Sequence, residues 1–344
     1  MSMEERITMA HGSGGEATGR LIEEIFAREF RNPYLSQMED STLVPGPGSG
    51  KIALTTDSFV VTPVEFPGGD IGRLCVCGTV NDLLMSGAEP RYLTCGFILE
   101  EGLGIAQLGR IVHSMAETAR EAGVLIAAGD TKVVENHSGP EGGLVINTAG
   151  VGFFPDKRTE LSPACIRKGD AVLVSGTLGD HHAAILGKRM HLDNRIRSDN
   201  APLGEMVRKL ISEGIRIHEM RDVTRGGLAT VLNEFAESSG KIITLEEEKL
   251  PVSQDVKAFC GILGLDPLYM GNEGKMVCLV DGADADRALE IIRSCRYGEH
   301  AARIGGVSEP DEAAGERPAL LIRTGIGGRR IAGPLYGEGL PRIC

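Results

Sequence analysis

The sequence has few of the features that would place it in a membrane or secreted class. Its 344 residues include no tryptophan, and aromatic residues make up 4% of the chain. No run of eighteen apolar residues occurs, and the N-terminal stretch resembles neither a signal peptide nor a transit peptide. Eight cysteines are scattered without a C-x-x-C pair, which argues against a disulfide framework or a zinc knuckle. We therefore expect a cytoplasmic protein without a membrane segment.

Positive charge is also scarce. The chain carries 36 Lys and Arg against 48 Asp and Glu, which gives a formal net charge of -12. Such a surface repels phosphates and gains no counterion release, so nucleic acid is not an expected partner. With 42% hydrophobic residues and a mean hydropathy of -0.04, the chain can bury a substantial core, and its length indicates two domains. An excess of carboxylates also suits the binding of a cation.

The spacing of apolar residues predicts an α+β protein with two unequal halves. In the first half, strands are expected at 51–64, 92–99, 124–134 and 143–154, and helices at 73–87, opened by Asp70 as a cap, and at 108–123. In the second half, a strand, a Gly turn and a helix are expected at 163–186, helices at 199–217 and 284–295, a Gly pair with a helix within 222–238, and strands at 276–280 and 319–324. The predicted divisions are 1–155, 156–324 and a flexible tail at 325–344.

A Gly-rich turn, HGSGG, lies near the N-terminus at His11–Gly15. Its backbone N–H groups could hold a phosphate, although it matches neither a P-loop nor the dinucleotide-binding fingerprint. A turn without a ligand is an equally good interpretation from these residues alone.

Four aspartates stand among small or apolar residues at the ends of expected elements, namely Asp40, Asp57, Asp82 and Asp130. A lone charge in such a position is costly unless it is paired or binds a metal. Each one alone could be a cap or a turn residue, and Asp82 could be an ordinary acid on a helix. Together they favour Mg²⁺, which usually bridges carboxylates to the phosphates of a nucleotide.

The second half adds two candidate sites. Asp222 and Arg225 precede a Gly pair and a helix, a suitable place for an anion or a metal–phosphate group. Glu273, in LGLDPLYMGNEGKM, precedes a strand, and its spacing alone suits an ordinary turn acid. Lys132, in GDTKVV, is equally compatible with a surface lysine.

Two adjacent pairs of residues have plain structural interpretations. His181 and His182 follow a Gly-Asp pair at an expected helix start and are interpreted as caps or solvated residues rather than ligands. Cys75 and Cys77 lie in the apolar run RLCVCGTV and are interpreted as small buried hydrophobes rather than a redox pair.

The chain ends with GEGLPRIC, so that Cys344 carries both a thiol and the terminal carboxylate. A frayed terminus is the simplest interpretation, and prenylation is disfavoured because its signal requires a Cys four residues from the end. The tail from Gly325 is rich in glycine and poor in apolar periodicity. From Gly337 to Cys344, seven residue steps of ~3.3 Å span roughly 23 Å, enough to carry the thiol into an interdomain cleft.

These segments, taken in order, carry a family resemblance. HGSGG, LTTDSFVVTP, IGRLCVCGTVNDLLMSGAEPRYLT, GDTKVV, MRDVTRGGLA, LGLDPLYMGNEGK and the terminal PRIC closely resemble the HypE family of hydrogenase maturation factors, within the aminoimidazole ribonucleotide synthetase-like (PurM-like) superfamily. The resemblance runs from His11 to Cys344. One departure is Val223, where this family more often has proline, and it affects only the local turn.

The resemblance implies a two-domain α+β subunit that forms a homodimer through its N-terminal sheets and has a C-terminal α/β sandwich domain. It implies an ATP-dependent carbamoyl dehydratase, a lyase that converts an S-carboxamide on the terminal cysteine into a thiocyanate. That group supplies the cyanide ligand of [NiFe] hydrogenase. The implied partners are the carbamoyltransferase HypF and the iron-carrying HypC–HypD complex.

The matching motifs also imply residue roles. The catalytic residues would be Cys344 as the substrate carrier, with Glu273 and Lys132 near the incoming tail. The ATP-binding residues would be His11, Gly12, Gly14, Gly15, Thr56, Asn81, Gly129, Thr131 and Arg225. The Mg²⁺ ligands would be Asp40, Asp57, Asp82, Asp130 and Asp222.

Two other classes remain open from the residues. Selenophosphate synthetases and thiamin monophosphate kinases would share the aspartates but need no terminal cysteine, and the former carry a reactive Cys or Sec near the N-terminal turn, whereas the first cysteine here is Cys75. Outside the enzymes, the chain could be a scaffold whose thiol docks to a metal-carrying partner. Mg-dependent ATP binding separates the enzyme from the scaffold.

Overall fold

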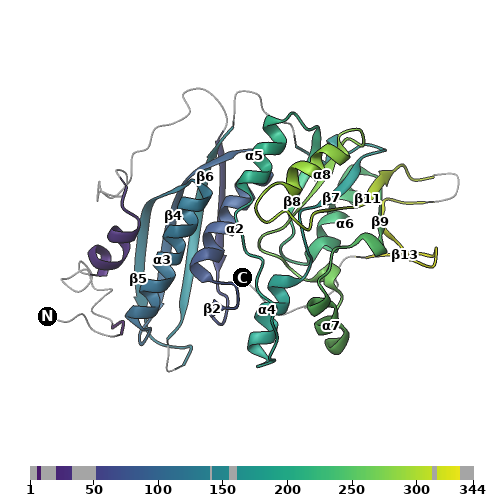
Figure 1. Cartoon of the computed structure of the whole chain (residues 1–344). Helices are drawn as coiled ribbons and strands as arrows, with labels where there is room; N and C mark the ends of the chain where they lie inside the picture. Colours follow the sequence, from purple (N-terminus) through teal and green to yellow (C-terminus); the bar gives the residue numbers. More distant parts are fainter. Residues whose placement is uncertain are drawn as a thin grey trace.

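A computed structural model of the chain describes residues 6–8, 21–32, 52–139, 142–154, 161–311 and 316–333. Within these ranges the chain builds a four-stranded sheet and a seven-stranded sheet that lie next to each other with helices between and around them (Figure 1). A short two-stranded ribbon, β2 (Glu65–Phe66) with β3 (Gly69–Asp70), lies where the two halves meet. None of the helices in these ranges is both long and apolar enough to cross a membrane.

The first sheet has the strand order β1-β6-β4-β5. Its strands are β1 (Ile52–Phe59), β4 (Glu89–Glu100), β5 (Leu125–Val134) and β6 (Leu144–Phe153). Helices α2 (Ile71–Met85) and α3 (Ile105–Ala122) cover one face, and a short helical segment, η2 (Ile22–Ala27), lies beside α3. The predicted cap is confirmed, because the Asp70 carboxylate accepts a hydrogen bond from the Arg73 N–H at the start of α2.

The other face of this sheet has no helix over it among the described residues (Figure 1). Side chains alternate along each strand, and those on the uncovered face include exposed apolar residues: Ile52, Leu54, Ile98 and Leu125. Monomers seldom leave a sheet face of this kind in water. The uncovered face is therefore a candidate for contact with another protein surface.

The second sheet has the strand order β13-β12-β9-β11-β7-β10-β8. Its strands are β7 (Ala171–Val174), β8 (Ile217–Asp222), β9 (Ile242–Glu246), β10 (Met276–Val280), β11 (Ala302–Ser308), β12 (Ala319–Arg323) and β13 (Arg329–Ile331). Helices α5 (Gly204–Ser212) and α8 (Ala285–Arg293) pack on one face, and α6 (Gly227–Ser239) packs on the other. The buried strands are rich in Val, Leu and Ile, which fits a sheet covered on both sides.

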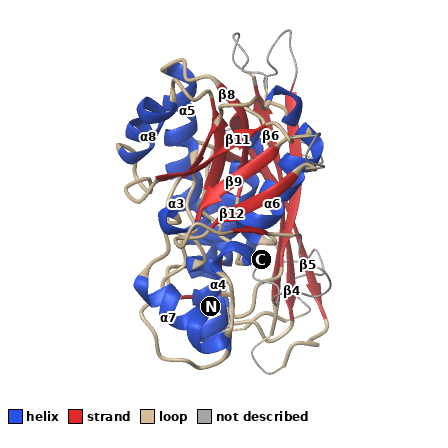
Figure 2. Ribbon diagram, turned by 90° about the vertical axis from the view of Figure 1, so that its right-hand side faces the viewer, coloured by secondary structure: helices blue, strands red, loops and turns tan. Residues whose placement is uncertain are grey.

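A third packing unit lies below the second sheet (Figure 2). Helices α4 (Asp180–Arg189) and α7 (Gln254–Leu263) enclose a small core of their own. The short helical turns η4 (Pro163–Cys165), η5 (Glu247–Lys249) and η6 (Pro267–Tyr269) complete the connections of this half. Asp180, at the start of α4, and Lys275, just before β10, line a cavity between the two halves.

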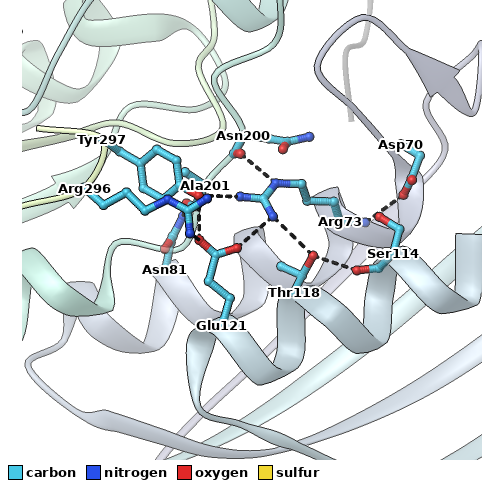
Figure 3. Close-up of polar contacts among 10 residues, drawn as sticks. All are labelled: Asp70, Arg73, Asn81, Ser114, Thr118, Glu121, Asn200, Ala201, Arg296 and Tyr297. Carbon is cyan, nitrogen blue, oxygen red and sulfur yellow. Dashed lines mark hydrogen bonds and ion pairs between the residues drawn. The ribbon is translucent and has the colours of Figure 1, made fainter. Parts of the chain in front are cut away.

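A polar network joins the two halves (Figure 3). The Arg73 guanidinium on α2 donates to the Asn200 backbone carbonyl at 3.0 Å, to Glu121 Oε2 at 2.9 Å and to the Tyr297 hydroxyl at 3.1 Å. Arg296 donates to Glu121 Oε1 at 2.9 Å, and Tyr297 donates to the same oxygen at 2.5 Å. One carboxylate of α3 thus binds two arginines and a tyrosine, which fixes the width of the space between the halves.

The predicted helix at 199–217 is wrong at both ends. Helix α5 covers only Gly204–Ser212, and Ile217 already belongs to β8. Pro202 disfavours a helical conformation at Ala201, and the Leu203 N–H donates instead to Asn81 Oδ1 at 2.9 Å. The five residues before α5 therefore form a loop that packs between the halves.

Candidate active site

Three of the predicted aspartates come together from separate elements. Asp57 lies near the end of β1 on the face that α2 covers, and Asp82 lies on α2 and accepts a hydrogen bond from Thr55 Oγ1 at 2.9 Å. Asp222 is the last residue of β8 and is buried. Gly78 lets α2 approach β1 closely, because a Cβ there would meet the Phe59 ring at 2.8 Å. The approach of α2 to β1 is what brings Asp82 to Asp57.

The charge of Asp57 acts on Asp82, and the charges of Asp57 and Asp82 both act on Asp222. Burial raises the pKa of Asp57 and of Asp82, and the charge of Asp57 raises the pKa of Asp82 further. Burial, followed by the charges of Asp82 and Asp57, raises the pKa of Asp222 to about 7. A set of buried carboxylates that resist ionisation together is stabilised by an added cation.

Glu273 adjoins the same set. It is 4% exposed and lies in the turn just before β10, whose first residue pairs with Asp222. Burial raises the pKa of Glu273 well above its usual range, and the charges of Asp222 and Asp199 add to the effect. An ordinary turn acid would be solvated, so the structure does not support that interpretation for Glu273.

Arg225 is the cation that faces this acidic group. Its charge lowers the pKa of both Asp57 and Asp82, while its side chain is exposed in the turn before α6. Gly227, in the same turn, has a positive φ of 65° and lies against the backbone of residues 268–270, where a Cβ would come within 2.5 Å of a carbonyl oxygen. The Gly pair therefore fixes the turn that presents Arg225.

The acidic group fits a divalent cation by chemistry rather than by preformed geometry. Asp57, Asp82 and Asp222 supply hard oxygen ligands from three rigid elements, as Mg²⁺ prefers. Within the described ranges, however, no three His, Cys, Asp or Glu side chains already stand in a metal-binding arrangement. Mg²⁺ usually keeps several waters and takes only one or two carboxylates with substrate phosphates, so this spacing is compatible with a metal–nucleotide site.

Asp130 and Lys132 lie elsewhere. Both are exposed on β5, the strand at the opposite edge of the first sheet from β1. Asp130 pairs with Gly96, which pairs with Asn147, which pairs with Ser58, so three strand spacings of ~4.8 Å place it roughly 14 Å from β1. Their side chains also project from the uncovered face, whereas Asp57 projects toward α2. Within one chain, these two residues do not join the acidic group.

The predicted ATP-binding residues have varied surroundings. Thr56 projects from the uncovered face and donates to the Thr148 carbonyl at 3.1 Å. Gly129 and Thr131 lie on β5 with Asp130. Asn81 is buried, and its amide donates to the Ala201 carbonyl at 3.0 Å while accepting from the Leu203 N–H. Asn81 therefore holds the two halves together, and an ATP contact for it stays a prediction.

Several predicted residues lie outside the described ranges. These are His11, Gly12, Gly14, Gly15, Asp40 and Cys344. Their proposed parts in phosphate binding, metal binding and substrate carriage remain predictions.

One interpretation of the histidines is wrong. His181 and His182 are buried rather than solvated, and helix α4 has no side-chain cap. His181 Nδ1 lies 2.7 Å from Ser198 Oγ, and its ring contacts the Phe66 ring edge-on. The burial of the histidines is not predictable from sequence because Phe66 and Ser198 come from distant segments.

The interpretation of Cys75 and Cys77 as buried hydrophobes is confirmed, since both are 0% exposed and free.

Sequence reasoning also missed a polar group behind Glu273. The Glu273 N–H donates to Asp199 Oδ1 at 3.1 Å, and Asp199 Oδ2 lies 3.3 Å from the Lys275 ammonium. The Asp199 and Lys275 side chains are 5% and 8% exposed. With Asp180 and Asn200 they border a cavity of about 740 Å³ between the halves. The signal available in the sequence was a lysine two residues after Glu273 in GNEGKM.

Comparisons with known proteins agree with this geometry. Residues 38–154 match the N-terminal domain family of AIR synthase related proteins, and residues 167–316 match the C-terminal domain family. The carbamoyl dehydratase HypE of Cupriavidus necator is 48% identical over 341 residues, which cover 98% of this chain and 95% of that protein. The predicted two-domain α+β fold is confirmed.

Two solved structures are similar over most of their length. A crystal structure of the hydrogenase maturation protein HypE in complex with ATP has a TM-score of 0.91 and 46% identity, and the match covers 98% of this chain and 99% of that one. A crystal structure of a HypE–HypF complex has a TM-score of 0.78 and 47% identity, over 92% of this chain and 99% of the other.

Proposed function

The chain belongs to the AIR synthase related proteins and, among them, to the carbamoyl dehydratases HypE, and from this we infer its reaction. It catalyses the ATP-dependent dehydration of a carbamoyl group on its C-terminal cysteine, Cys344, to a thiocyanate. The product supplies the cyanide ligand in [NiFe] hydrogenase maturation. The observation that carries this inference is the buried acidic group of Asp57, Asp82, Asp222 and Glu273, in a chain that resembles an ATP-bound structure over 98% of its length.

The chemistry explains why ATP is required. A carboxamide loses water poorly because its oxygen is a bad leaving group. We propose that the amide oxygen attacks the γ-phosphorus of ATP, so that the bond to the β-phosphate oxygen breaks and ADP leaves. The C–O bond then breaks, and the oxygen leaves within inorganic phosphate. Both N–H protons depart as the C–N triple bond forms, one bound to phosphate and one passed to solvent.

We propose that Mg²⁺ is held by Asp57, Asp82 and Asp222, together with Asp40, and that it would neutralise the charge on the transferred phosphate. The raised pKa values of these carboxyl groups support the proposal, because each would ionise more readily beside a cation. Arg225 lies on the same side and would bind a phosphate oxygen. The HGSGG turn, His11–Gly15, would cover the phosphates from outside.

We propose that Glu273 accepts an N–H proton. Its raised pKa supports this role, because a carboxylate whose pKa is high is a stronger base once it has lost its proton. The charges of Asp222 and Asp199 both raise the pKa of Glu273. Glu273 is therefore close both to a proposed metal ligand and to a residue that lines the interdomain cavity.

We propose a homodimer formed through the uncovered face of the first sheet, which presents Ile52, Leu54 and Ile98. This arrangement would explain why Asp130 and Lys132 project away from the acidic group of their own chain. A partner sheet placed against that face would carry its own Asp130 and Lys132 toward the other subunit. Thr56 would meet ATP at the same interface, whereas Gly129 and Thr131 would reach it through the backbone of β5, because Thr131 pairs with Phe97 on the covered face.

We further propose that HypF delivers the carbamoyl group and that the HypC–HypD complex receives the cyanide. A solved HypE–HypF complex supports the first of these partners. The proposed division of the chain remains 1–155, 156–324 and the tail 325–344. A reducing compartment such as the cytoplasm fits the seven cysteines that the structure describes, because all seven are free.

Intact mass spectrometry tests the proposed reaction. The chain carbamoylated at Cys344 should lose the mass of one water molecule when incubated with MgATP, while ADP and phosphate appear in equal amounts. Cys344→Ala should show no loss, and Glu273→Gln should bind ATP yet lose water far more slowly. ATP binding without any loss of water from the carbamoylated chain would instead support a scaffold.

A further inference from the structure

The cavity between the two halves carries an unusual concentration of unsatisfied polar atoms. Five buried side-chain atoms in the described ranges have no hydrogen-bond partner, and four of them belong to residues that line this one cavity. They are Asp180 Oδ2, Asn200 Oδ1, Asn200 Nδ2 and Asp199 Oδ2, the last of which is ion-paired with Lys275 at 3.3 Å without forming a hydrogen bond. Asn200 is 4% exposed, and Figure 3 shows its amide turned away from the Arg73 network that its own carbonyl joins. Buried polar atoms normally have partners, so this cavity is built to receive a ligand.

The chemistry of these unsatisfied atoms indicates a ligand that donates hydrogen bonds. Three of the four are oxygens that accept hydrogen bonds, and two of those belong to carboxylates. Lys275 is the buried cation among them and forms an ion pair with Asp199 at 3.3 Å, but no ion pair to Asp180 is formed among the residues that the structure describes. Burial raises the pKa of Asp180, and the charge of Asp199 raises it further. Hydrogen bonds from Thr177 and Ser253 and the charge of Lys275 act to lower the pKa of Asp180 without cancelling this rise. An added cation is therefore favourable beside Asp180.

The arginines at the rim of the cavity do not supply this added cation. Arg73 and Arg296 share the Glu121 carboxylate, and Arg293 donates to the Ala301 carbonyl. Arg197 is exposed at the mouth. The interior therefore suits one further donor-rich cation, whose planar group can reach two carboxylate oxygens at once.

We propose that this cavity binds the guanidinium of Arg342, in the tail of the same chain. The Arg342 guanidinium forms ion pairs with Asp180 and Asp199, and Asn200 Oδ1 accepts a hydrogen bond from a further guanidinium N–H. This inference rests on the proposed function, in which the tail carries the substrate. It names the side chains that recognise the tail, two residues before the modified cysteine.

The tail begins near enough to reach the cavity. The Gly333 carbonyl accepts a hydrogen bond from the Tyr269 hydroxyl at 2.8 Å, which anchors the chain beside η6. The next residue, Met270, lies against Gly179, which immediately precedes Asp180. Nine residue steps separate Gly333 from Arg342, and at ~3.3 Å each they span roughly 30 Å. The tail therefore has slack to enter the cavity rather than being stretched to it.

Binding at this place also delivers the cysteine to the acidic group. Asp199 accepts the Glu273 N–H through Oδ1 and presents Oδ2 to the cavity. Cys344 lies two steps, at most about 7 Å of backbone, beyond Arg342. A guanidinium held by Asp180 and Asp199 thus leaves the thiol within reach of the Glu273 side chain. The same aspartate positions the proposed base and the substrate carrier.

Alkylation of Cys344 in the full-length chain tests this docking. The rate with iodoacetamide is measured by peptide mass spectrometry and divided by the rate in urea for the same variant. We expect Arg342→Ala to raise this ratio roughly tenfold, as expected for the loss of charge-assisted hydrogen bonds, and Arg342→Lys to raise it less. Loss of a neighbouring cation alone would lower the thiolate fraction and slow alkylation, so a faster rate reports release of the tail. Arg329→Ala, an exposed arginine on β13, serves as the matched control.

A double-mutant comparison assigns the pocket. Asp180→Asn should raise the ratio as well, and combining it with Arg342→Ala should add little, because both changes remove one interaction. An unchanged ratio in Arg342→Ala overturns the docking, and so does full additivity; water is then the occupant of the cavity. The tail variants decide the matter even where Asp180→Asn does not fold.

The same samples keep the two inferences apart. If Arg342→Ala leaves the alkylation ratio unchanged while the carbamoylated chain still loses water with MgATP, the docking is wrong and the reaction stands. If the ratio responds to both substitutions while no water is lost, the docking stands and the proposed reaction is wrong.

Discussion

The backbone N–H of Glu273 donates to Asp199 Oδ1 at 3.1 Å, and this bond ties the turn before β10 to the loop before α5. The two segments also touch at Gly274, where a Cβ would come within 1.9 Å of the Asp199 carbonyl oxygen. The Lys275 ammonium closes the contact at 3.3 Å from Asp199 Oδ2. The position of Glu273 is therefore set by a loop that is 74 residues away in the chain.

Removal of the buried cation should destabilise this arrangement. In Lys275→Met, Asp199 keeps its charge in a buried place without its partner, and such losses cost on the order of 3 kcal/mol. We expect the free energy of unfolding in urea to fall by about this amount. Lys257→Met, at an exposed position on α7, is the control and should change stability little. Equal stability of the two variants would show that Lys275 contributes nothing to the turn.

Loss of one acid from the candidate site should weaken nucleotide binding. Asp82→Asn keeps the size of the side chain and its contact with Thr55 but removes a charge from the group that faces Arg225. We expect MgATP to bind roughly tenfold or more weakly, since a charge-assisted contact is worth about 1.5–3 kcal/mol. Calorimetric titration measures this, with Asp255→Asn on the exposed side of α7 as the control.

Chelation provides the complementary test of the same site. If Mg²⁺ joins the carboxylates to the nucleotide, EDTA should weaken ATP binding to the unmodified chain strongly and to Asp82→Asn much less. The same loss on chelation in both proteins would separate Asp82 from the metal.

The interdomain network should contribute to stability through Glu121. Burial opposes ionisation, but hydrogen bonds from Tyr297 and Arg73 outweigh it and lower the pKa of Glu121. Glu121→Gln keeps the shape but gives two arginines a neutral partner, so we expect a loss of about 1–3 kcal/mol in unfolding free energy. Glu117→Gln, one turn earlier on α3, removes an ion pair with the exposed Arg120 and should lose less than about 0.5 kcal/mol.

Local features of the fold were predictable because neighbouring residues determine them. Asp70 was recognised as a cap, and the apolar spacing of α3 was sufficient to place that helix. Local apolar spacing predicts a helix where the loop before α5 lies, because it takes no account of Pro202 or of the hydrogen-bond partner of the loop, Asn81, which is 122 residues away in the chain. Local pattern carries no information on such a partner.

In the candidate site, too, residue type could be predicted from the sequence, but the spatial arrangement of the residues could not. Asp57, Asp82 and Asp222 were identified as acids in apolar surroundings, but only the fold shows that β1, α2 and β8 bring them together. Asp130 and Lys132 looked equivalent to them in sequence. The register across four strands places these two at the far edge of the sheet and on its other face.

Protonation of His182 should lower the stability of the folded chain at acidic pH. This side chain is 3% exposed, and burial, followed by the charges of His181 and Arg189, lowers its pKa from 6.5 to about 4. Between these values the unfolded chain binds more protons than the folded one, so the stabilising effect is complete above pH 6.5 and is lost as the pH falls toward 4. Folding therefore loses up to about 3 kcal/mol through this group on acidification. His182→Gln removes the group that must stay neutral, so the free energy of unfolding should fall less between pH 7 and pH 4.5 than in the unmodified chain.

Acids with raised pKa values, such as Asp222, change stability in the opposite direction, so the informative quantity is the difference between variant and parent at each pH. His300→Gln, at an exposed position, is the control and should give a curve parallel to the parent. A parallel curve for His182→Gln as well would mean that His182 becomes protonated without cost in the folded chain. The space around its ring would then have to admit water or a carboxylate.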